Sequence, residues 1–230
     1  MIPVHDDNPT HITPWVTWAL IGACALVFVW QAMGGDLRFG AIIAGLGATP
    51  EVLFGREHAL EDPPWVPAWA TVFTSMFLHG SLAHLLGNML FLWVFGNNVE
   101  DAMGHARFIA FYLLCGVVAV FAQALPDPAG TVPMVGASGA ISGVLGAYLL
   151  LYPRARVLLA LPPPLMFLTI GWVRAVWVLA GWFLMQLFMA GLSGIGGGGV
   201  AFGAHIGGFV AGMALVPLMK QAHIPLFRRH

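Results

Sequence analysis

Polar side chains inside long apolar stretches are the residues of this sequence that could do chemistry. His84 and Asn88 stand in "SLAHLLGNMLFLWVF", Ser138 in "PMVGASGAISGVLGAYLLLYP" and His205 in "GAHIGGFVAG". A polar side chain in an apolar membrane segment is costly and is by default a functional candidate. A serine hydroxyl becomes a good nucleophile when a neighbouring base takes its proton, and histidine can do this near neutral pH. Ser138 and His205 could therefore act together if the fold brings them into contact.

The composition indicates that these stretches lie in a membrane. Of the 230 residues, 59% are apolar and 8% are charged, with a mean hydropathy of +0.85, whereas soluble domains carry about 25% charged residues. The net charge of −1 offers no basic surface, so we expect no nucleic-acid partner. The histidines show no metal-ligand spacing such as H-E-x-x-H, and we expect neither a metal nor a cofactor. Cys24 and Cys115 lie in apolar runs and are expected to be buried thiols.

Six stretches are long and apolar enough to cross the hydrocarbon core as helices, which takes about 20 residues. They are residues 14–33, 77–97, 107–126, 135–152, 172–191 and 199–219. The sequence therefore predicts an all-α membrane protein with a six-helix domain over 14–219, which includes an outer loop at 34–72. Tails at 1–13 and 220–230 flank it. We expect no appended soluble domain.

The basic residues of the short connections predict the orientation. With a cytoplasmic N-terminus, seven of them lie at the inner side and two, Arg38 and Arg56, lie outside. The inner set is Arg107, Arg154, Arg156, Arg174, Lys220, Arg228 and Arg229. Both tails are then cytoplasmic, and the second, fourth and sixth helices begin at the outer face.

Three of the polar residues lie at a similar depth. His84 is about seven residues into its stretch, Ser138 about three and His205 about six, which places each roughly 5–11 Å from the outer end. Small residues follow Ser138 and His205 at helical spacing: Gly139, Ser142, Gly143 and Gly146, and Gly208 and Gly212. Small-xxx-small patterns let helix backbones approach closely. We therefore expect the fourth and sixth helices to touch and to bring Ser138 Oγ within hydrogen-bond reach of the His205 ring.

Each polar residue also has a simpler interpretation. A serine in a membrane helix is most often a packing residue bonded to its own helix carbonyl. A single intramembrane histidine can be a pore, cofactor or structural residue, and His84 with Asn88 could be one interhelical hydrogen bond. The common depth favours the shared outward cavity over these alternatives.

Three motifs, taken together, resemble those of the rhomboid intramembrane serine proteases. They are "HGSLAHLLGNMLFLWVFGNNVED", "GASGAISG" and "GAHIGGFVAG", in that family's order, and the resemblance extends over residues 14–219. It implies a six-helix rhomboid bundle and a serine endopeptidase that cleaves in or near transmembrane segments of substrate proteins in the lipid bilayer. By similarity, Ser138 is the nucleophile and His205 its general base, a catalytic dyad without an acidic third member.

The resemblance also implies roles for neighbouring residues. His84 and Asn88 match the family's oxyanion residues and would act with the Ser138 backbone N–H. His79 matches a further family histidine with a structural role, and "GNNVED" matches a cytoplasmic turn after the second helix. Gly136, Gly139 and Gly208 are expected to have a substrate-binding or structural role, because they make room for a substrate backbone or for helix contacts.

Two positions depart from the family pattern. The first outer loop reads "AWATVFTS", with Trp69 but without the arginine of a frequent Trp-Arg pair. Ser142 stands four residues after Ser138, where many members carry an aromatic residue against which the base stacks.

The glycine-rich stretch 194–200 is expected to form a mobile cap over the cavity.

The alternative function is a non-catalytic rhomboid-like binder or chaperone of transmembrane segments, which would use the same scaffold. Lateral access for a substrate is expected near the fifth helix, which carries Trp172, Trp177, Trp182, Phe183 and Phe188; the same aromatics could simply face lipid. We expect a bacterial plasma membrane as the location. The natural substrate and the oligomeric state do not follow from the sequence.

Overall fold

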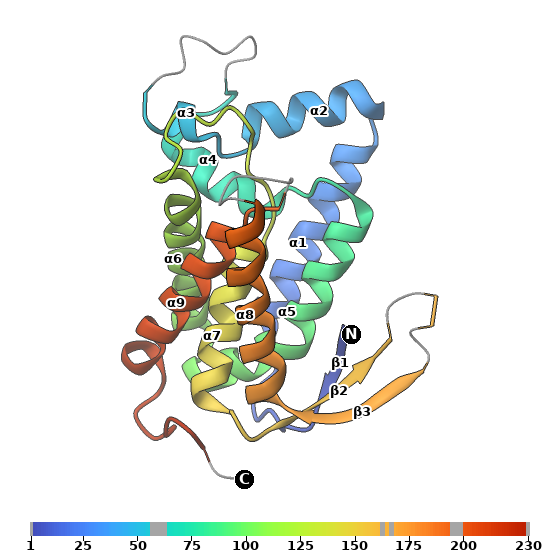
Figure 1. The fold of residues 1–230 in the computed structure, drawn as a ribbon, viewed down its shortest axis with the longest axis vertical. Helices are drawn as coiled ribbons and strands as arrows, with labels where there is room; N and C mark the ends of the chain where they lie inside the picture. Colours follow the sequence, from blue (N-terminus) through green and yellow to red (C-terminus); the bar gives the residue numbers. More distant parts are fainter. Residues whose placement is uncertain (1, 56–63, 162–163, 166–167, 194–199, 229–230) are drawn as a thin grey trace.

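The computed structural model describes residues 2–55, 64–161, 164–165, 168–193 and 200–228. In this part of the chain, six long helices form a bundle, and each overlaps one of the predicted apolar stretches (Figure 1). They are α1 (Trp15–Ala32), α5 (Leu82–Met103), α6 (His105–Ala124), α7 (Ser138–Leu151), α8 (Ala175–Ser193) and α9 (Phe202–Met219). The predicted outer loop contains α2 (Gly35–Leu46), α3 (Pro50–Leu53) and α4 (Ala68–Thr74), followed by the short 3-10 helix η2 (Ser75–Phe77).

Not all six long helices meet a strict length requirement for crossing a membrane. Among the described residues, α1, α6, α8 and α9 are long and apolar enough. A fifth span results if residues 68–77 and α5 are counted together, although the two are bent by 82°. The remaining helix, α7, has 14 residues. The chain is thus an integral, multi-pass membrane protein with four or five spans by length and composition.

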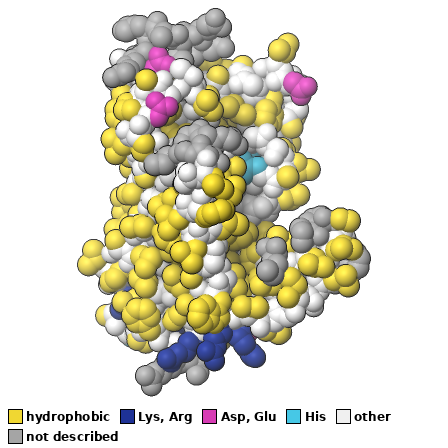
Figure 2. Space-filling view, viewed as in Figure 1, with side chains coloured by type: hydrophobic (Ala, Val, Ile, Leu, Met, Phe, Trp, Pro, Cys, Tyr) yellow, Lys and Arg dark blue, Asp and Glu magenta, His cyan; other side chains and the backbone are white. Residues whose placement is uncertain are grey.

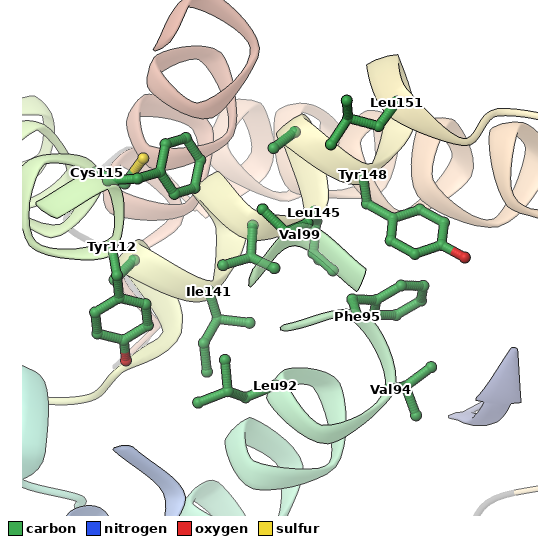
Figure 3. Close-up of a cluster of buried hydrophobic side chains, with 14 of the residues drawn as sticks. Leu92, Val94, Phe95, Val99, Tyr112, Cys115, Ile141, Leu145, Tyr148 and Leu151 are labelled. Carbon is green, nitrogen blue, oxygen red and sulfur yellow. The ribbon is translucent and has the colours of Figure 1, made fainter. Parts of the chain in front are cut away.

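Helix α7 lies at the centre of the bundle. All of its residues from Gly139 to Tyr148 are buried, which suits a helix made of small and aliphatic side chains. Figure 3 shows the side chains of Ile141, Leu145 and Tyr148 directed toward α5. There the Tyr148 ring packs edge-on against Phe95, with 5.0 Å between centroids. Helix α7 is therefore enclosed by the rest of the bundle along most of its length.

The structure is mostly helical, as predicted, but a three-stranded antiparallel sheet that the sequence analysis did not predict lies beside the end of the bundle opposite α2 (Figure 1). Its order is β1 (Ile2–Asp6), β2 (Arg156–Ala160) and β3 (Thr169–Arg174). Strands of five or six residues in apolar runs cannot be told from helix by periodicity alone. As a result, Trp172, predicted on the fifth helix, lies in β3, and the segment predicted as an N-terminal tail is partly a strand.

The motif "GNNVED" is helical rather than a turn. Helix α5 continues through it and ends before Gly104, which has φ of 76°. The Glu100 carboxylate accepts hydrogen bonds from the backbone N–H groups of Val16 (2.9 Å) and Thr17 (2.7 Å), and Asp101 accepts one from Ile12 (3.0 Å). The first N–H groups of a helix lack partners within it and favour negative charge. Glu100 thus caps α1 from a neighbouring helix.

The end of β1 is held by a buried polar cluster. Oδ2 of Asp6 accepts hydrogen bonds from the Tyr148 hydroxyl (2.5 Å) and from Asn98 Nδ2 (2.9 Å), and the Asn8 amide donates to Asn98 Oδ1. Burial raises the pKa of Asp6 from 3.8 to about 6, while the Tyr148 hydrogen bond and nearby His5 act in the opposite direction. The N-terminal segment is therefore docked on α5 and α7 by specific contacts.

Candidate active site

Ser138 and His205 meet at the start of two adjacent helices. Ser138 is the first residue of α7, and His205 lies in the first turn of α9. Nε2 of His205 is 2.8 Å from Ser138 Oγ, which is an ordinary hydrogen-bond distance. Both side chains are half-buried. The structure therefore brings together the two residues whose types could form a nucleophile and a base.

The close approach of α7 and α9 explains this contact. A Cβ on Gly208 would collide with the Gly139 carbonyl, and a Cβ on Gly212 would collide with the Gly143 carbonyl. Neither position can hold a larger residue without moving a backbone. The predicted contact through small residues is confirmed, and it sets the distance between Ser138 and His205 by backbone packing.

His84 and Asn88 lie next to the loop that leads into α7. Ser81 caps α5 by accepting a hydrogen bond from the His84 N–H (3.1 Å), which places His84 in the first helical turn. Gly136 has φ of 122°, and a Cβ there would lie 2.7 Å from His84 Cε1 and 3.6 Å from Asn88 Nδ2. Only glycine suits this backbone and this space. The two side chains thus face the segment two residues before Ser138.

The predicted second helix, at residues 77–97, contained both His79 and His84, but in the structure only His84 lies on α5. His79 lies in the bend between η2 and α5, where its side chain is fully buried. Its backbone is held by Gln31 of α1, whose Oε1 accepts from the His79 N–H (3.1 Å) and whose Nε2 donates to the His79 carbonyl (3.3 Å). The rings of His79 and His84 pack edge-on at 5.3 Å between centroids. His79 thus supports the ring of His84.

In the part of the chain that the structure describes, two buried nitrogen atoms of this region have no hydrogen-bond partner: Asn88 Nδ2 and His79 Nε2. A buried polar atom left unpaired costs free energy and calls for an explanation. Asn88 Nδ2 lies beside Gly136, close to the start of α7, where the first backbone N–H groups also lack partners within the helix. Asn88 Nδ2 thus lies near a helix start, where backbone N–H groups without helical partners favour negative charge.

Two residues of α8 contact His205: Gln186, which the sequence analysis did not name, and Trp182, which it named only as one of the helix's aromatics. Oε1 of Gln186 in α8 lies 2.8 Å from His205 Nδ1, and Gln186 is buried. The ring of Trp182, one turn earlier, lies 5.7 Å from the His205 ring at an interplanar angle of 40°. The Ser142 hydroxyl donates a hydrogen bond to the Ser138 carbonyl (2.6 Å), and it is not directed at His205. A single amide in an otherwise apolar helix was the available signal for Gln186.

The other aromatic residues of α8 divide into two groups. Phe183 stacks on Phe209 of α9, with 4.5 Å between ring centroids. Trp177 and Phe188 are 69% and 65% exposed, so they face away from the bundle. The predicted wall of aromatics is therefore only partly directed inward. The cap predicted at 194–200 lies, apart from its last residue, outside the described residues.

A small cavity of about 30 Å³ adjoins Ser138. Its lining includes Ser75, Gly116, Ala119 and Gly136, so small residues from several elements enclose it. A space of this size holds one or two water molecules or a methyl-sized group.

A sequence model of the family described as the Rhomboid domain matches residues 67–222. This match covers more than half of the chain, and the chain belongs to the rhomboid family.

Three relatives illustrate the family. The chain is 38% identical to rhomboid protease GluP of Bacillus subtilis over 136 residues, 59% of this chain and 24% of that protein. It is 31% identical to the mitochondrial rhomboid protein 1 of Saccharomyces cerevisiae over 132 residues, 55% of this chain and 38% of that protein. It is 35% identical to the human mitochondrial presenilin-associated rhomboid-like protein over 104 residues, 44% of this chain and 27% of that protein. The matches thus span less than two fifths of each relative's length.

Proposed function

We propose that this protein is an intramembrane serine endopeptidase that hydrolyses peptide bonds in or near transmembrane segments of other membrane proteins, with Ser138 and His205 as its catalytic dyad. The observation that carries the proposal is the 2.8 Å contact between Ser138 Oγ and His205 Nε2 at the start of α7. Membership of the rhomboid family and the 38% identity to a relative named as a protease support it.

The dyad would act by general base and nucleophilic catalysis. Oγ of Ser138 attacks the scissile carbonyl carbon while its proton passes to His205 Nε2. The carbonyl oxygen becomes an oxyanion, for which the Ser138 N–H, His84 and the unpaired Asn88 Nδ2 are the proposed donors. The C–N bond then breaks as Nε2 returns the proton to the leaving amine. Water attacks the acyl group through the same steps and restores Ser138.

We infer six spans, with α7 as the sixth. Because α7 is enclosed by other helices, its 14 residues need not match the lipid thickness. On the face shown in Figure 2, Lys and Arg side chains gather at the end where the chain leaves α9, and Asp and Glu at the end near α2 and α3. The excess of basic residues at one end supports a cytoplasmic location for that end and for both termini. The dyad then opens toward the outer face.

The substrates of this proposal are transmembrane segments that can unwind, because a helix keeps its carbonyls in its own hydrogen bonds. The small cavity beside Ser138 favours a small side chain next to the cut. Of the three relatives reported, the bacterial one has the highest identity, which supports a bacterial plasma membrane as the location.

The test is cleavage of a single-span test substrate by the purified protein in detergent. Ser138→Ala and His205→Ala should each abolish cleavage without loss of folding. His223→Ala, at an exposed histidine beyond the end of α9, is the control and should cleave as the wild type does. A serine-reactive fluorophosphonate should label the wild type at Ser138. If the wild type neither cleaves nor is labelled, the protein is instead a non-catalytic binder of transmembrane segments.

A further inference from the structure

Gln186 is the only side-chain amide of α8, a helix that is otherwise built of apolar residues and glycines and ends in a serine. Many of its neighbours are exposed, including Leu184, Met185 and Leu187. Gln186 itself is only 4% exposed, so it is turned into the bundle. A side-chain amide buried in a membrane helix costs free energy unless it has a hydrogen-bond partner. Its partner is His205 Nδ1, at 2.8 Å.

This contact selects one tautomer of the histidine. A carbonyl oxygen only accepts hydrogen bonds, so the proton of the neutral ring must be on Nδ1 when it faces Gln186 Oε1. Nε2 then carries a lone pair directed at Ser138 Oγ. The opposite amide orientation would place the ring proton on Nε2, where it would block transfer from Ser138.

We infer that Gln186 is a positioning residue for the general base, which holds the His205 ring in the tautomer and orientation that can take the proton of Ser138. This inference rests on the proposed protease function. During proton transfer, the Ser138 proton moves to Nε2, while Nδ1–H remains donated to Gln186. The hydrogen bond strengthens when the ring becomes positively charged. A neutral amide does this without the cost of a buried carboxylate.

Trp182 completes the arrangement from the same helix. It lies four residues before Gln186, on the same face, and packs against both His205 and Phe209. Ser142 cannot provide an aromatic surface. In this chain the orientation of the base therefore depends on α8, and a displacement of α8 from α9 would release both contacts.

The test uses the purified full chain, the single-span test substrate and the variants Gln186→Met and Gln186→Glu. Methionine keeps the length and removes the acceptor, so kcat should fall about 10- to 100-fold with KM nearly unchanged. Glutamate restores an acceptor for Nδ1–H, so it should recover activity to within about tenfold of the wild type. Met185→Leu, at the exposed neighbouring position, is the matched control and should behave as the wild type.

The outcomes separate the inference from the proposed function. An active wild type with Gln186→Met within twofold of it would overturn the positioning role. Equal losses in both variants, accompanied by a lower Tm, would show that Gln186 is needed for packing instead. A wild type that neither cleaves nor labels would overturn the protease function, and the inference with it.

Discussion

Buried polar side chains lie at two places along α5, and they differ in whether they have hydrogen-bond partners. In the C-terminal part of α5, Asn98 and Glu100 are fully buried, and their side chains bond to the N-terminal segment and α1. Near its N-terminus, Asn88 on α5 and His79 in the preceding bend are also buried, yet among the described residues each has a side-chain nitrogen atom without a partner. Satisfied buried groups stabilise a fold, whereas unsatisfied ones reduce stability and are retained where a ligand pairs with them. We therefore expect substitutions at Asn98 and Glu100 to change stability, and a substitution at Asn88 to change the proposed activity.

Glu100→Ala should have the largest effect on stability. It removes the acceptor for the Val16 and Thr17 N–H groups and for the Thr17 hydroxyl, all in a buried site. We expect a loss of about 3–5 kcal/mol in the free energy of unfolding, because these donors and the His105 ring lose their partner. Thermal unfolding in detergent measures this. Asp36→Ala, on exposed α2, should change stability by less than about 1 kcal/mol.

Asn88→Ala should instead lower activity and leave stability unchanged or slightly increased. If Asn88 Nδ2 donates to the oxyanion, kcat should fall about 100-fold or more. The Tm should be unchanged or slightly higher, because a buried nitrogen without a partner is removed. Steady-state cleavage and thermal unfolding of the same preparation test both parts. A lower Tm with unchanged kcat would place Asn88 with the structural residues.

Asn98→Ala is the matched variant ten residues further along α5. It leaves Asp6 and Asn8 without their amide partner and should cost about 1–3 kcal/mol of stability. The kcat of the remaining folded protein should equal that of the wild type. Activity per folded molecule, determined by titration with the fluorophosphonate, is the appropriate readout. A reduced kcat would mean that the two ends of α5 are coupled.

Asp6→Asn should have an effect of the opposite sign, a gain in stability that depends on pH. Because the pKa of Asp6 is raised from 3.8 to about 6 in the folded protein, the folded state binds more protons between these values, and wild-type stability falls as pH rises through this range. The asparagine variant lacks this loss. It should therefore be more stable than the wild type at pH 7.5, by at most about 3 kcal/mol, and the difference should shrink toward pH 4.5. A difference independent of pH would contradict the raised pKa.

The sequence predicted the helices and the contact between Ser138 and His205 because both depend on strong local patterns. Apolar length located the six long helices, and glycines at helical spacing predicted the contact of α7 with α9. The sheet was missed because β2 and β3 are short apolar runs next to predicted spans. Gln31 and Gln186 were missed although each is a polar side chain in an apolar helix, the signal used for His84 and Asn88. Their partners are distant in sequence, so only the fold shows what they hold.

The length of α7 has a consequence for where a substrate would be cut. Fourteen residues make a helix of about 21 Å, whereas the hydrocarbon core is about 30 Å thick. If the last turn of α7 reaches one boundary of the core, Ser138 lies several ångströms beneath the other. In the proposed protease, the length of α7 would then set the depth at which the substrate bond is cut. In a thicker bilayer, the cut would move along an extended substrate by about one residue for every 3.3 Å of added thickness on that side.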